Sequence, residues 1–289
     1  MDTIRNPIEW SMDKLREAGH ALEEASDSTL HGEDEARVNH HPAVRRIGVA
    51  DLFDVLKNGF DDFGYYRTDV MFICIIYPIA SVVLMHAAFN YDMLPLLFPL
   101  AAGFALVGPV AAIGLYEMSR RRERGLKATW LSAFGVLHAP SVGPVAILAL
   151  MLLGIFGLWL ATAQLIYTLT LGPEPPVSIS AFVSDVLTTG AGWAMIVIGM
   201  GVGFLFAVVV LTISVVSFPM LLDRPVGVSA AIGTSVRAVV ANPVPMAAWG
   251  VIVAGGLVLG SIPAFLGLIL VLPVLGHATW HLYRRLVAD

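Results

Sequence analysis

Six ionisable residues stand at the ends of long apolar stretches of this sequence, and they are its main candidates for chemistry. They are Glu117, Arg120, Asp223, Arg224, His277 and His281. Ionisable side chains are costly in hydrocarbon, so those kept near a membrane are candidates for function. If the three stretches end together, the six residues could line a cytoplasmic vestibule for a headgroup, an ion or a peptide. We favour the structural alternative, in which the carboxylates pair with neighbouring arginines and fix the helix ends.

The two histidines allow a test of metal or haem chemistry. His277 and His281 are four residues apart, so on a helix their imidazoles share one face. With His138 they are weak candidates for a metal site, because neutral imidazole is a common metal ligand. This pair alone cannot hold a haem, whose two axial ligands approach from opposite faces. We therefore expect no haem, metal or other cofactor, and favour hydrogen bonds to carbonyls, water or headgroups.

The rest of the sequence carries little catalytic signal. Cys74 is the only cysteine, which excludes an intrachain disulfide and a CxxC redox motif. We find no nucleotide-binding, hydrolase or metalloprotease motif in a suitable context, and no nucleic-acid signature. The polar residues expected within the membrane can bond to helix carbonyls; they are Thr162, Gln164, Thr212, Ser214 and Ser217. The sequence thus indicates no catalytic residue and leans against an enzyme.

The elements that must position these residues are apolar helices. Of the 289 residues, 57% are hydrophobic and 13% are charged, and a bilayer-spanning helix needs about 20 apolar residues. Gaps between charged residues predict six spans, at 70–90, 93–116, 142–170, 188–219, 244–261 and 264–282. The last two form a hairpin broken at Ser261, Ile262 and Pro263. We expect an all-α polytopic membrane helix bundle.

Charge placement predicts the orientation of these spans. In the six-span arrangement every Lys and Arg falls on one side, and the three opposite loops contain none. Basic loops stay in the cytoplasm, so both termini are expected there, in a bacterial inner membrane. Residues 1–45 form an acidic and largely disordered cytoplasmic tail with a short helix near 7–25, and residues 46–289 form the six-span domain.

A weak internal repeat predicts how the domain is organised. Segments that begin at Gly48, Gly125 and Gly227 each run through an amphipathic stretch into a pair of spans, and Pro140 or Pro243 ends the second and third stretch. Two-span units keep the same orientation, which predicts three parallel units. The amphipathic helices should lie on the inner membrane surface with Asp51, Asp54, Asp61 and Asp62 facing water, or tuck under the bundle as elbows.

Four segments carry a family resemblance. They are GLYEMSRR at 114–121, FPMLLDR at 218–224, SVRAV at 235–239 with NPVPM at 242–246, and GHATWHLYR at 276–284. Together they make residues 45–287 resemble a family of bacterial integral membrane proteins catalogued as domain of unknown function 2189. Some members carry the label cytochrome c oxidase subunit I, which the resemblance would imply for this chain by name only. With half the spans of such a subunit and only shallow histidines, the chain is left with an accessory or assembly role near respiratory complexes. No haem-ligand set carries over to residues of this chain.

Three functions follow from these observations. The leading one is a structural, accessory or assembly membrane protein whose cytoplasmic face engages a membrane-protein partner or a second copy of the chain. The alternative is a small-solute permease or channel, which requires a polar passage through the bilayer. The second alternative is a haem- or metal-binding respiratory subunit centred on His277 and His281. The lipid bilayer is a partner in all three.

Overall fold

The computed structural model describes residues 42–74, 86, 94–127, 129, 141–263 and 265–288. The chain separates into two compact units, Met1–His40 and His41–Asp289. The expected tail helix at 7–25 lies outside the described residues, and everything below concerns the second unit.

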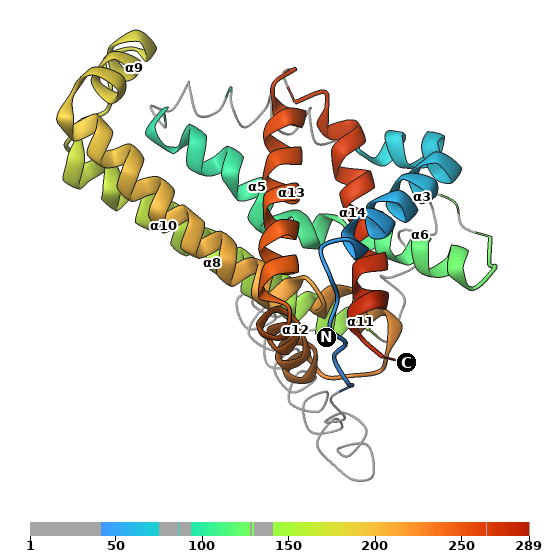
Figure 1. Cartoon of the computed structure of the whole chain (residues 1–289). Coiled ribbons are helices and arrows are strands. Elements are labelled where there is room, and N and C mark those ends of the chain that lie inside the picture. The colour runs from blue at the N-terminus through green and yellow to red at the C-terminus, as the bar shows by residue number, and fades with distance from the viewer. Residues whose placement is uncertain are drawn as a thin grey trace, which may run out of the picture. The chain divides into compact units, whose positions relative to one another are not determined.

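Helices make up the described part of this unit (Figure 1). They are α3 (Asp51–Cys74), the short 3-10 helix η1 (Leu94–Leu96), α5 (Leu97–Ala111), α6 (Ile113–Glu123), α8 (Val142–Thr170), α9 (Ile179–Thr188), α10 (Gly190–Ser214), α11 (Ser217–Asp223), α12 (Val228–Ala241), α13 (Pro243–Ser261) and α14 (Leu268–Leu286). These residues form no strand, and only an isolated antiparallel bridge joins Val44 to Val287. The all-α expectation is confirmed for this part of the chain.

Three helical stretches are long and apolar enough to cross a membrane, judged by length and composition. They are Val142–Thr170, Gly190–Asp223 and Pro243–Ser261, and they coincide with the third, fourth and fifth expected spans. Thr189 starts the second of them by accepting a hydrogen bond from the Gly192 N–H, as N-capping threonines do. α13 ends at Ser261, where the sequence predicted a break.

The second expected span, 93–116, differs from the structure. Its helix stops at Ala111, and a new helix starts at Ile113. Pro109 lies inside α5 without ending it, since the Ala112 N–H still donates to the Gly108 carbonyl over 2.9 Å. Close to it, the Leu115 N–H bonds to the Ala112 carbonyl in a tight turn. The expected span is therefore divided into two helices at Ala112.

The first and last expected spans are placed only in part. α3 runs without interruption from Asp51 to Cys74, so it joins the first amphipathic segment to the start of the expected span 70–90. Residues 75–85 and 87–93 are outside the described part, and the rest of that span stays a prediction. α14 begins at Leu268 and continues to Leu286, slightly later at both ends than the expected span 264–282.

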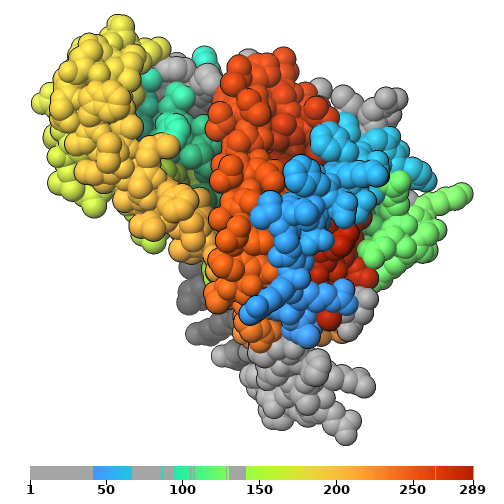
Figure 2. Space-filling view, in the orientation of Figure 1, coloured from blue at the N-terminus to red at the C-terminus, as the bar shows by residue number. Residues whose placement is uncertain are grey.

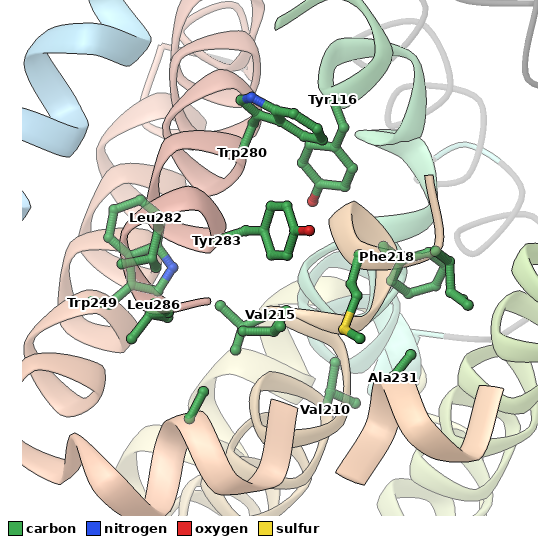
Figure 3. Packing of buried hydrophobic residues seen from close by; sticks show 14 of the residues in the cluster. Tyr116, Val210, Val215, Phe218, Ala231, Trp249, Trp280, Leu282, Tyr283 and Leu286 are labelled. Atoms are coloured by element: carbon green, nitrogen blue, oxygen red, sulfur yellow. The ribbon is translucent and has the colours of Figure 1, made fainter. Parts of the chain in front are cut away.

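The tightest packing surrounds α14. It lies against α3, α6, α11 and α13, and Figure 3 shows buried side chains such as Trp249, Trp280 and Tyr283 meeting there. Gly59 of α3 allows a close approach, since a Cβ atom at this position would lie 2.8 Å from the Ala278 nitrogen. The ends of the described chain are tied here too, because the Arg45 N–H donates to the Leu286 carbonyl over 2.7 Å.

Candidate functional site

Three helix ends meet at one end of the unit, as the sequence suggested they could. Arg120 Nη1 of α6 donates to the Leu222 carbonyl of α11 over 2.9 Å. The Tyr283 hydroxyl of α14 donates to Asp223 Oδ2 over 2.8 Å. The α6 end is set by Gly125, whose φ of 69° suits the glycine that closes a helix. We call these helix ends, with the facing part of α3, the polar end.

Glu117 is buried but has two cationic partners. It accepts hydrogen bonds from Arg120 Nε at 2.8 Å and from Arg121 Nε at 2.7 Å. A buried carboxylate is tolerated when it is paired and hydrogen-bonded. The ion pair expected between Glu117 and Arg120 is therefore present. Arg121, the next residue of α6, is a second cationic partner of Glu117.

Asp223 has more partners than Glu117, and they come from three helices. Besides Tyr283, it meets Arg124 Nη2 at 3.0 Å, Arg284 Nη1 at 3.5 Å and Arg224 Nε at 3.9 Å. Burial, followed by the nearby charge of Asp223, raises the pKa of Tyr283, so this hydroxyl stays protonated and donates. Arg224 Nη2 also donates to the Ala288 carbonyl over 2.6 Å. Asp223 and Arg224 thus anchor the C-terminus.

Asp62 corrects an expectation from the sequence, because it does not face water. Only 4% of its surface is exposed, and it accepts hydrogen bonds from Ser119 Oγ at 2.5 Å, Arg122 Nη1 at 2.5 Å and His281 Nε2 at 2.9 Å. The close approach of α3 at Gly59 turns Asp62 toward α6 and α14. We call Asp62, Ser119, Arg122, His277 and His281 the Asp62 cluster.

The charge state of Asp62 follows from these contacts. Burial by itself raises the pKa of Asp62, but the hydrogen bonds from His281 and Ser119, together with the electrostatic influence of His281 and His277, lower it, and the net pKa lies below the ordinary value of 3.8. The carboxyl is therefore ionised at neutral pH. Its negative charge is what allows one group to accept bonds from three helix-borne donors at once.

His277 lies deepest in the cluster and is fully buried. Its Nδ1 is 2.7 Å from Ser119 Oγ. Since that hydroxyl gives its proton to Asp62, we assign the proton between them to Nδ1 of the imidazole. Nε2 makes no hydrogen bond within the described residues, although the Leu115 backbone lies near the ring. His277 therefore ends a chain of hydrogen bonds that begins at the partly exposed His281.

Serine, histidine and aspartate occur together here, yet the arrangement is not that of a hydrolase. In a catalytic triad the histidine accepts the serine proton and the aspartate orients the histidine. Here Ser119 donates to Asp62 instead, and it is 1% exposed. No substrate carbonyl could reach such a hydroxyl without opening the helix packing. The geometry supports a structural hydrogen-bond network.

The same cluster bears on the proposed metal ligands. His277 Nδ1 and His281 Nε2 lie 3.9 Å and 2.9 Å from Asp62 Oδ2, so the two imidazoles do share a face. The Arg122 guanidinium already supplies the positive charge beside that carboxylate. Among the described residues no group of three or more His, Cys, Asp or Glu side chains is arranged to hold a metal. His138 lies outside the described part.

Sequence reasoning missed Asp62, Ser119, Arg122 and Tyr283. A usable signal was present for Asp62, which falls at the same helical spacing as the buried residues Leu52, Val55 and Tyr66. A carboxylate on the apolar face of an amphipathic helix is a sign of a buried polar contact. Nothing comparable marks the other three, whose partners come from distant segments.

Long apolar helices with exposed apolar flanks and a polar end define an integral membrane protein of the all-helical class. Residues 97–223 match the model of the family DUF2189, described as predicted integral membrane protein. This confirms the resemblance over that range; the similar segments at 235–239, 242–246 and 276–284 lie beyond it. No curated protein and no solved structure matches the chain. The family description names no activity.

Proposed function

We propose that this protein is a non-enzymatic accessory or assembly protein of a bacterial inner membrane, and that its polar end holds a partner membrane protein. One observation carries the proposal. The ionisable residues at this end neutralise each other across α3, α6, α11 and α14. Groups committed to mutual pairs suit a rigid platform better than a vestibule that must exchange a ligand.

The proposal includes six crossings in three parallel two-span units, with both termini in the cytoplasm. Support comes from the distribution of cations. α6, α11 and α14 carry arginines in or just after their last turn, whereas residues 171–189 between α8 and α10 contain no Lys or Arg. Basic residues are retained on the cytoplasmic side, which would make the polar end cytoplasmic.

The outer edge of the polar end is the surface that would meet the partner. Arg124 and Arg285 are each about half exposed, with side-chain exposures of 49% and 45%. Glu123, next to Arg124 in the chain, bonds to Arg284 over 2.9 Å and to Trp280 over 3.0 Å. Half-exposed arginines held by neighbouring carboxylates are preorganised for a complementary charged surface.

The test is quantitative cross-linking in cells. The full chain, tagged at its N-terminus, is produced at native level in its own host and cross-linked before solubilisation in mild detergent. We expect one membrane protein to be captured at a constant ratio. Arg124→Gln with Arg285→Gln should lower that ratio at least about tenfold, equivalent to 1.4 kcal/mol, while the control Arg237→Gln on α12 should not change it. Melting temperatures must show that both variants are folded.

Other outcomes would overturn the proposal. If the Arg124→Gln, Arg285→Gln double variant captured as much partner as the control does, the partner would not bind at the polar end. A haem absorption band or stoichiometric metal that disappears with His277→Ala would make the chain a respiratory subunit. Uptake of a solute by proteoliposomes holding the purified chain would make it a permease or channel.

A further inference from the structure

Helix α3 presents a buried face and an outer face with different chemistry. Leu52, Val55 and Tyr66 are buried against the bundle, and Gly59 touches α14. The opposite side of the helix is not covered by another described segment in the view of Figure 2, where it appears in blue. Among the described residues, this side of the helix therefore carries exposed side chains.

Two phenylalanines mark this outer face. Phe53 is 74% exposed and Phe60 is 53% exposed. They are seven residues apart, so they lie on nearly the same line along the helix, about 10 Å from each other. Val49, one turn before Phe53, is also exposed. Large apolar side chains on one line of a helix give that side of it an apolar surface suited to binding.

The charges around this line are divided between two flanks of α3. Lys57 lies between the two phenylalanines, and Arg46 precedes the helix; both are exposed and neither has a carboxylate partner among the described residues. On the other flank, Asp51 and Asp54 are paired with Arg285 at 3.2 Å and 3.0 Å. Asp61, on the same acidic flank, is exposed and has no cation at ion-pair distance among the described residues. The acidic flank is thus neutralised at Asp51 and Asp54 only, and Lys57 is the cation that accompanies the phenylalanines.

We propose that this outer face of α3, formed by Phe53, Lys57 and Phe60 with Val49 just before the helix, docks on anionic phospholipids of the surrounding bilayer. The phenyl rings enter the boundary between headgroups and acyl chains, and the Lys57 ammonium reaches a lipid phosphate. Two features favour lipid over a protein partner. The charge between the two phenylalanines, that of Lys57, is cationic, which suits phosphate, and α3 continues without a break into its apolar end at 70–74, next to the predicted first span.

This inference goes beyond the proposed function because it assigns a second surface to a different ligand. The protein partner would use the edge near Arg124 and Arg285, while lipid would use the aromatic flank of α3. Lipid bound there would press α3 against α14 and so hold Asp62 in its cluster.

Spin labelling can test the lipid face, since the chain has a single native cysteine. In a Cys74→Ser background, one nitroxide is placed in turn at Phe53→Cys, Phe60→Cys and the control Asp61→Cys, whose native side chain is exposed on the acidic flank. The full-length protein is reconstituted in vesicles of phosphatidylglycerol and phosphatidylcholine. Collisions with oxygen, enriched in lipid, are compared with collisions with a water-soluble nickel chelate.

We expect the ratio of oxygen to nickel collisions to be at least about threefold higher at positions 53 and 60 than at 61, as for side chains buried in the interface. Vesicles of phosphatidylcholine alone should lower the ratio at position 60, and Lys57→Gln should abolish this dependence on lipid charge. Equal ratios at 60 and 61 would overturn the proposal. So would labels at 53 and 60 that neither reagent reaches, which would indicate a protein or a second copy on this face. Neither result depends on Arg124 or Arg285.

Discussion

The polar end and the hairpin of α8 and α10 provide hydrogen-bond partners for their polar side chains in different ways. At the polar end, buried carboxylates find partners on other helices: Asp62 on α3 binds groups of α6 and α14. In the hairpin, hydroxyls bond within their own helix, as Thr162 does to Leu158 and Thr212 to Val208, each over 2.7 Å. The first arrangement ties helices together, and the second lets each helix satisfy itself in lipid.

The difference extends to packing. Trp159 is the main tertiary anchor of the hairpin; its indole donates to the Pro99 carbonyl over 3.1 Å, and its ring covers Gly203. Many apolar side chains of α8 and α10 stay exposed. Figure 1 shows these two helices side by side, capped by α9. Specific side-chain contacts are therefore concentrated at the polar end, and mutations there should cost most.

Removing Asp62 should give the largest effect. Asp62→Ala leaves Ser119 and His281 without their acceptor and Arg122 without its ion pair. Breaking a buried pair costs 3–5 kcal/mol, and we expect about 3 kcal/mol here because Arg122 is partly exposed. Denaturant titration in detergent measures this free energy of unfolding. Asp61→Ala is the control and should change the free energy of unfolding by less than about 0.5 kcal/mol. Equal losses for the two variants would mean that the contacts of Asp62 do not stabilise the protein.

The contact of α3 with α14 should be the next most sensitive. Gly59→Ala places a Cβ atom 2.7 Å from that of Ala278 and 2.8 Å from backbone atoms of α14, so the helices must shift. We expect a loss of about 1–3 kcal/mol. The control Gly64→Ala, on the same helix, meets nothing within 4 Å and should stabilise the protein slightly through higher helix propensity. A stable Gly59→Ala variant would contradict the close packing.

Deleting one hydroxyl in each region compares them directly. Ser119→Ala removes the link between His277 and Asp62 and should cost roughly 1–2 kcal/mol, because buried polar atoms lose a partner. Thr212→Val removes a hydroxyl that bonds only to its own helix, and should cost less than about 0.5 kcal/mol. Thermal melting of the two variants in one detergent gives the comparison. Similar losses of stability in the two variants would show that hydroxyl groups contribute equally in the two regions.

The pH dependence should show the smallest effect. The pKa of Asp62 is lower in the folded protein than its ordinary value of 3.8, so the unfolded state takes up its proton first as pH falls. The stability that ionised Asp62 contributes is complete above pH 3.8 and is lost as pH drops through the lower folded value. Melting temperatures should therefore fall more steeply below about pH 4 in the wild type than in Asp62→Asn. Parallel curves would show that Asp62 does not titrate as proposed.

Part of this picture could be predicted from residue order. Runs of apolar residues identified α8, α10 and α13, because a helix that crosses lipid must satisfy its own backbone. Glu117 and Arg120 are three residues apart on one helix, so their ion pair follows from local geometry. The break at Ala112 was missed, since Pro109 is tolerated within some membrane helices and only its surroundings decide whether the chain turns.

What the sequence determined by itself was the kind of protein: helical, resident in a membrane, with ionisable residues kept out of its long apolar stretches. These properties depend on composition and short-range spacing. Only the tertiary structure decided which groups meet. Asp62 and His281 are 219 residues apart, and their contact depends on how closely α3 approaches α14 at Gly59. Such a contact is set by the packing of whole helices, so no local pattern in the chain determines it.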